Sequence, residues 1–142
     1  MKIAYRIAAV GGAGYTTLAD EGSPTLAEKI SGYQPALAKS PYEAPGYGAA
    51  GVTVVDMGNQ KWKIAFIIER VHATPDAAAQ YLVTHPLAFA AIGNLDLQIT
   101  VGATVIYFPA CAVTEFSPEP HSDQSTKIKY AFTGGSYTLT SP

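Results

Sequence analysis

The stretch Lys61–His72, KWKIAFIIERVH, decides the fold. Successive side chains of an extended strand point to opposite faces. The apolar residues here fall on both faces: Ile64, Phe66 and Ile68 on one, and Ala65, Ile67 and Val71 on the other. A strand that is apolar on both faces is typical of one buried on both. The sequence therefore predicts a central strand, covered on each side by other parts of the protein.

A helix start follows this strand directly. Thr74 supplies a capping hydroxyl, Pro75 suits the first helical position, and Asp76 places an acid at the positive end of the helix dipole. We expect the helix over Ala77–Thr84. It should end at His85-Pro86, because the residue before a proline avoids helical angles, with Leu87–Ile92 forming at most a second short turn.

The remainder of the chain favours strands. Alternating apolar residues predict them at Lys2–Val10, Val52–Met57, Leu95–Val101, Thr104–Val113, Lys127–Thr133 and Ser136–Leu139. A short helix is expected from Ser23-Pro24 to Lys29, a two-residue turn at Gly102-Ala103, and a polar loop over Ser117–Ser125. The prediction is one α+β domain over residues 1–142, predominantly antiparallel β as a sheet or sandwich, with one main α-helix.

The segment from Gly32 to Gly51 has a different character. Tyr33, Tyr42 and Tyr47 alternate there with prolines and glycines, and Lys39 and Glu43 are its charged residues. A tyrosine offers a large contact area with few rotatable bonds, and long aperiodic segments in compact domains are usually functional. We expect residues 32–51 to form an extended loop or arm, with these three tyrosines binding a partner.

Composition excludes several classes of protein. Of the 142 residues, 48% are hydrophobic and 14% are charged, with a net charge of −2. The apolar share excludes a disordered chain. Near neutrality disfavours nucleic acid and anionic membranes as partners, since both select basic patches. The low charge, together with a strand that is apolar on both faces, predicts that other copies cover part of the surface in a homo-oligomer.

The N-terminal residues do not have the pattern of a signal peptide. Arg6 interrupts the apolar run and leaves Ile7–Val10 before the glycines, whereas a signal peptide needs ~7–15 apolar residues. No apolar run approaches the ~18 residues of a membrane span. The expectation is a soluble protein made in a cytoplasm, with no membrane partner.

A glycine-rich turn is the one feature that suggests a cofactor. Gly11-Gly12-Ala13-Gly14 follows a predicted strand, as a dinucleotide-binding turn would. Gly22 and Pro24 interrupt the helix that such a turn requires, and no Lys-Ser or Lys-Thr follows. We expect a plain turn and no cofactor.

Metal sites and nucleophiles are also not predicted. His72, His85 and His121 lack the i, i+4 or i, i+2 spacing that directs two imidazoles at one metal. Cys111 lies in an apolar strand without an activating motif, which favours a buried structural thiol. These residues predict neither a metal nor a catalytic group, and hence no enzyme.

Two weaker interpretations stay open. Glu115, Glu119 and Asp123 are expected to be solvated loop residues, with a weak cation site as the alternative. Trp62 with Tyr42, Tyr47 and Tyr107 could form a sugar-binding platform, although such aromatics are more often core or interface anchors. A small β ligand-binding module, possibly specific for carbohydrate, is therefore the alternative function.

A series of motifs fills the second half of the chain. In order, they are Trp62 and its strand, Ala73-Thr74-Pro75-Asp76-Ala77-Ala78, Tyr81-Leu82, His85-Pro86, Leu95-Asp96-Leu97 and Lys129-Tyr130-Ala131-Phe132-Thr133-Gly134-Gly135. This series, from about Gly58 to Leu139, resembles small tail-associated structural proteins of bacteriophages and prophages. The resemblance implies a self-assembling subunit that contacts other virion proteins and is found in the virion, or in the host cytoplasm during assembly. It carries over no active-site residue.

Overall fold

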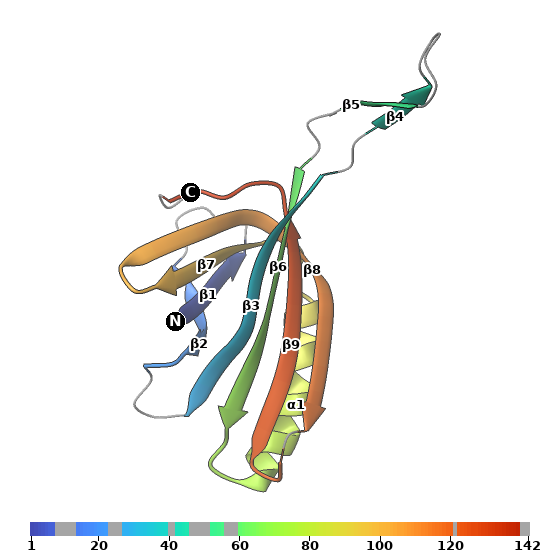
Figure 1. The fold of residues 1–142 in the computed structure, drawn as a ribbon. Helices are drawn as coiled ribbons and strands as arrows, with labels where there is room; N and C mark the ends of the chain where they lie inside the picture. The colour runs from blue at the N-terminus through green and yellow to red at the C-terminus, as the bar shows by residue number, and fades with distance from the viewer. Residues whose placement is uncertain are drawn as a thin grey trace.

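The computed structural model describes residues 1–7, 14–22, 27–39, 42–45, 52–55, 60–120 and 122–139. These residues form nine strands and one helix: β1 (Lys2–Ile7), β2 (Thr16–Asp20), β3 (Glu28–Lys39), β4 (Tyr42–Pro45), β5 (Val52–Val55), β6 (Gln60–Val71), α1 (Pro75–Ala90), β7 (Leu95–Val101), β8 (Thr104–Pro120) and β9 (Ser125–Gly134) (Figure 1). An antiparallel seven-stranded sheet has the order β2-β1-β7-β8-β9-β6-β3, and β4 pairs with β5 separately. The predicted α+β class, mostly antiparallel β with one main helix, is confirmed.

The predicted central strand is β6, which pairs with β3 on one side and β9 on the other. Its Ile64, Phe66 and Ile68 are buried in the core. The opposite face is not covered: Ala65 and Ile67 are half-buried and Val71 is 45% exposed. The expectation of burial on both faces is wrong, because α1 and the strands β1 and β7 all contribute their buried residues to the same core as Ile64 and Phe66.

The helix α1 begins as predicted but continues further. Thr74 Oγ1 accepts a hydrogen bond from the Ala77 N–H at 3.1 Å. Pro86 lies inside the helix instead of ending it. A proline there removes one hydrogen bond and crowds the preceding turn. The packing of buried Phe89 against Tyr5, and a 2.9 Å hydrogen bond between His85 and Tyr130, stabilise the turns on both sides of the proline.

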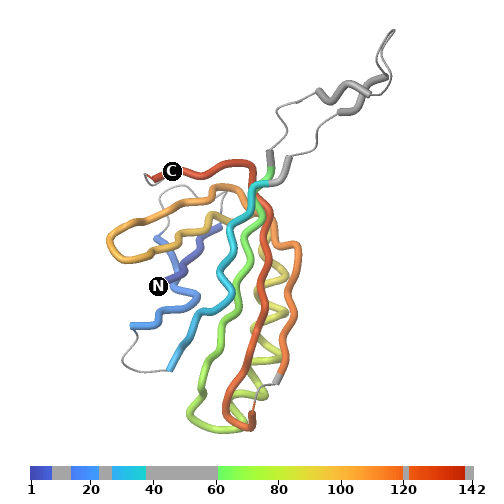
Figure 2. Tube along the Cα trace, in the orientation of Figure 1, coloured from blue at the N-terminus to red at the C-terminus, as the bar shows by residue number. Residues whose placement is uncertain are grey.

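The long strand β8 joins two halves of the sheet. It pairs with β7 up to Cys111 and with β9 from Ala112 onward. Figure 2 shows its first half crossing the upper end of the long strands before the chain turns down beside β9. At this turn Ala110 has a φ of 51°, and its N–H donates to Asp96 Oδ1 at 2.9 Å. Because buried Asp96 also pairs with Arg6 at 2.9 Å, an ion pair holds the bend in place.

Several expected boundaries are corrected. Strand β8 continues to Pro120, so the polar loop expected from Ser117 is strand for its first four residues. A short strand was expected over Ser136–Leu139, but only Thr138 forms a bridge, to Tyr107. Strand β2 had no clear apolar alternation and was not predicted.

The region around Gly32 also differs from the expectation. Glu28 and Lys29 begin strand β3, where the end of a short helix was expected. Gly32, with a φ of 62°, lies in a bulge at which the pairing with β6 shifts. The expected loop therefore starts as strand up to Lys39, and Tyr42–Pro45 is strand as well.

Candidate assembly surfaces

The uncovered face of the long strands is the first candidate surface. The middle of this face includes Ala65, Ile67 and Ala131. Ala65 is paired with Ala131, and Ile67 lies two residues after Ala65 on β6. Charged pairs border them: Lys127 lies 3.9 Å from Glu69 and Lys129 lies 3.6 Å from Glu115. The face therefore mixes a small apolar patch with charged residues, since Lys129 is paired directly with Ile67 and Glu115 with Ala131.

The two edges of the same half-sheet are the second candidate. Among the described residues, β3 has β6 as its one strand partner, and the second half of β8 has β9. Proline is found in these two strands, as Pro35, Pro118 and Pro120, and not in β6 or β9 between them. Proline in a sheet is confined to edge strands. The half-sheet β3-β6-β9-β8 thus has an edge strand on each side.

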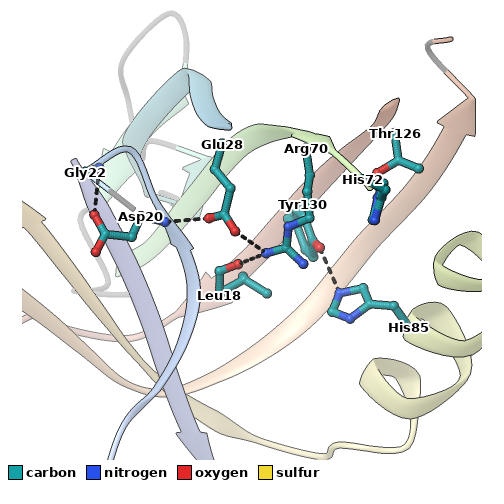
Figure 3. A network of polar contacts seen from close by, with 9 residues as sticks. All are labelled: Leu18, Asp20, Gly22, Glu28, Arg70, His72, His85, Thr126 and Tyr130. Atoms are coloured by element: carbon teal, nitrogen blue, oxygen red, sulfur yellow. Dashed lines mark hydrogen bonds and ion pairs between the residues drawn. The ribbon is translucent and has the colours of Figure 1, made fainter. Parts of the chain in front are cut away.

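Side chains close the lower part of the β3 edge (Figure 3). The Asp20 N–H donates to the Glu28 carboxylate at 2.7 Å, and Arg70 bridges Glu28 at 3.1 Å and the Leu18 carbonyl at 2.7 Å. The Glu21 carboxylate accepts from the Ile30 N–H at 3.0 Å. These contacts tie β2 to β3, so the part of β3 beyond Ser31 remains for another partner.

The three predicted partner-binding tyrosines have different outcomes. Tyr33 lies in β3, half-buried, and lines a small apolar hollow together with Trp62. Burial raises the pKa of its hydroxyl. Tyr42 lies in β4, and Tyr47 lies outside the described residues. Their role in partner binding stays a prediction.

Two of the histidines lie in an aromatic cluster between α1 and the sheet. His85 stacks on Tyr81 with centroids 4.7 Å apart and hydrogen-bonds Tyr130, while His72 hydrogen-bonds Thr126 at 3.0 Å. Burial, and secondarily the positive charge of Arg70, lowers the pKa of His72 and lowers that of His85 to about 4. Both imidazoles are therefore neutral at pH 7, and their contacts connect α1 to the sheet. His121 lies outside the described residues.

The remaining candidate groups lie apart. Cys111 is buried, as predicted, and burial raises the pKa of its thiol to about 12. Glu115 and Glu119 are exposed on β8, and Glu115 is paired with Lys129. Within the described part of the chain, no three His, Cys, Asp or Glu side chains come together as a metal site.

The proposed sugar platform is not assembled from the side chains that the structure describes. Trp62 is half-buried and meets Phe108 and Tyr137 edge-on, at 6.1 and 5.6 Å. Tyr107 instead packs near Tyr15 and accepts a hydrogen bond from Gln98. Trp62 also lines a small apolar hollow with Tyr33 and Tyr137, so a ligand-binding module stays the alternative prediction.

Membrane insertion through a helix has no candidate among the described residues, since none of their helices has both the length and the apolar character to span a bilayer.

Comparisons with known proteins include two solved structures of low similarity to this chain. No protein-family model matches the chain, and no curated protein matches it. A chain in the tail of an empty gene transfer agent particle, solved with C6 symmetry, is 12% identical with a TM-score of 0.48, over 99% of this chain and 95% of that one. A chain in the virion of a native gene transfer agent is 11% identical with a TM-score of 0.42, over 89% of both chains.

Proposed function

We propose that the chain is a non-enzymatic structural subunit of a phage-derived virion, associated with its tail, and that it acts by self-assembly. The half-sheet β3-β6-β9-β8 carries this proposal. It has an edge strand on each side and, on a face that the described residues leave open, a small apolar patch of Ala65, Ile67 and Ala131 among charged side chains.

Two edge strands on opposite sides of one subunit favour assembly into a repeating structure. An edge presents unpaired C=O groups and, except at Pro35, Pro118 and Pro120, unpaired N–H groups that another strand can pair with. When the two complementary edges lie on opposite sides of one subunit, the contact is head-to-tail, and copies close into a ring or extend into a filament. Edge pairing extends the half-sheet sideways and leaves its face open, so that face is covered through a further contact, with other copies or with other virion proteins.

The titratable groups of the described chain support a non-enzymatic role. His72 and His85 are neutral and hold α1, Asp96 is paired with Arg6, and the Cys111 thiol is protonated. Each group is occupied in holding the fold together. Catalysis needs a base or nucleophile that faces a substrate, and these four face the protein interior.

Assembly of the purified full chain tests the proposal. Sedimentation velocity over a hundred-fold concentration range should show a monomer that converts to one large species, and electron microscopy should show rings or tubes of uniform diameter. A strict monomer over the whole range contradicts the proposal. Association with a tail is tested separately, since particles isolated from the cells that encode the chain should contain many copies of it in the tail fraction.

A further inference from the structure

We infer that two copies meet through a specific contact: the outward side of α1 of one copy sits against an apolar hollow at the β3 edge of the next. This inference rests on the proposed function, because it names the surfaces through which the subunit assembles. It is carried by two apolar features on opposite sides of one molecule.

The first feature is the outward side of α1. The helix has 16 residues, of which Asp76 is the one charged residue. Val83 is 63% exposed and Leu87 is 71% exposed. They are one helical turn apart, so they form a single projecting apolar ridge. The same side of α1 also carries the exposed polar residues Gln80 and Thr84, so the ridge is an apolar patch on a helix side of mixed polarity.

The second feature is a hollow of about 170 Å³ at the upper part of β3. Its lining is apolar and mostly aromatic: Tyr33, Pro35, Trp62, Ile106, Phe108 and Tyr137. Leu37 lies beside it, paired with Trp62 in the ladder, and is 45% exposed. The contacts that tie β2 to β3 end at Ile30, so this part of the edge is not closed by them.

The residue pairing across β3, β6 and β9 relates the height of the ridge to that of the hollow. Pro35 is paired with Ile64, and Ile64 is paired with Phe132. The Phe132 ring lies 6.1 Å from that of Phe89, which follows Leu87 by two residues in α1. The Leu87 end of the ridge therefore lies near the level of Pro35, at the border of the hollow. The ridge is next to β8 and β9, on which α1 packs, whereas the hollow is next to β3 at the other edge of the half-sheet (Figure 1).

A second copy of the chain is the occupant that fits both features. The ridge and the hollow of one molecule cannot contact each other. A neighbouring copy beside it can place its ridge against the hollow of the first copy, at a similar height. The outward side of α1 has no charged residue beyond Asp76 with which to select a charged partner. The contact also runs alongside the edges of β3 and β8, so it adds to the head-to-tail association of the half-sheets.

Two variants that each block one side test this contact. V83R/L87R changes the ridge, and P35R/L37R changes the border of the hollow. Val101→Arg is the matched control, because Val101 is an apolar residue, 44% exposed, at the β7–β8 turn away from both features. All three change exposed side chains, so cooperative thermal unfolding like that of the wild type should confirm that each is folded.

The expected result is a specific pattern of mixing. Each double variant alone should stay monomeric at concentrations where the wild type and V101R assemble. An equimolar mixture of the two should form one-to-one pairs and stop there, because one intact ridge and one intact hollow remain. Native mass spectrometry reads this stoichiometry directly.

Other outcomes overturn the inference in distinguishable ways. If the wild type does not assemble, the proposed function fails and the inference fails with it. If the wild type assembles and the double variants do so equally well, only the inference fails. A Leu87→Cys variant covers the case in which the arginine variants do not fold: covalent dimers of L87C alone show contact between two helices and overturn it, whereas L87C joined to Leu37→Cys in mixtures supports it.

Discussion

The two faces of β6 both carry apolar residues, but one is buried and the other, which also carries Lys61, Lys63 and Glu69, is not. Ile64, Phe66 and Ile68 are buried under α1 and the other half of the sheet. Ala65 and Ile67 point the other way and remain half-exposed. The hydrophobic effect favours removing both faces from water in proportion to their apolar area. One face is covered by folding, and we propose that the other is covered by assembly.

This difference shows why a strand that is apolar on both faces is ambiguous in a self-assembling protein. Periodicity shows which positions of a strand carry apolar side chains. It does not record whether the covering residues belong to the same chain. Substitutions on the two faces should therefore separate folding from association, since each acts on a different step.

The largest effect is expected on the covered face, from Phe66→Ala. The Phe66 ring is buried and stacks on Tyr130 at 5.3 Å and on Phe132 at 5.6 Å. Truncation leaves a cavity at the centre of the core and should lower the free energy of unfolding by about 3–5 kcal/mol. Chemical denaturation monitored by circular dichroism measures this. A loss below about 1 kcal/mol would mean that the covered face is not the core.

Gly134→Ala should reveal how tightly the covered face is packed at its upper end. A Cβ on Gly134 would lie 2.7 Å from Cys111 Sγ, which is too close for a real contact. Both residues are buried, so the neighbouring strands must shift, at a cost of about 1–3 kcal/mol. In a Cys111→Ala background the sulfur is absent, and the cost of Gly134→Ala should fall by at least half. Equal costs in both backgrounds would contradict this explanation.

Local signals in the sequence were sufficient for much of the fold. The Thr74-Pro75-Asp76 start of α1 and the alternation in Leu95–Val101 are both observed. They depend on adjacent residues alone. The end of α1 could not be predicted in that way, because Pro86 is accommodated through contacts of Phe89 and His85 with residues far along the chain. Glu28 and Lys29 likewise became strand because Glu28 pairs with Arg70 of β6.

The candidate surfaces were less accessible from the sequence. Low charge and the tyrosines at 33, 42 and 47 indicated a partner, but not which surfaces would meet it. The ridge of Val83 and Leu87 was missed because the helix was expected to end at Thr84. The hollow was missed because it combines β3, β6 and β8 with Tyr137. The sequence signal that could have indicated the ridge was the near absence of charged residues in the helix.

Acidification should weaken the covered side through His85. Its pKa of about 4 in the folded protein lies below the ordinary 6.5, so the unfolded chain binds a proton more readily. The contribution of the neutral His85 imidazole to the free energy of unfolding is fully present above pH 6.5 and is lost as the pH falls toward 4. Since the ring is partly exposed, screening by solvent limits the effect to about 1–2 kcal/mol. Urea unfolding at pH 7, 5.5 and 4.5 should show this decline, and His85→Gln should flatten it. An unchanged slope in that variant would exclude His85 as the cause.

The smallest effect on folding is expected at the open face, from Ile67→Thr. Threonine keeps the β-branched shape that suits a strand, and Ile67 is only half-buried. The free energy of unfolding of the monomer should change by less than about 0.5 kcal/mol, which is typical of surface positions.

Ile64→Thr is the matched control. It makes the same change on the covered face, where the hydroxyl would be buried, and should cost at least about 2 kcal/mol. In sedimentation velocity, Ile67→Thr should raise the concentration needed for assembly several-fold, because each copy loses apolar area at the contact. If Ile67→Thr destabilises the monomer as much as Ile64→Thr and leaves assembly unchanged, the two faces of β6 do not have separate roles.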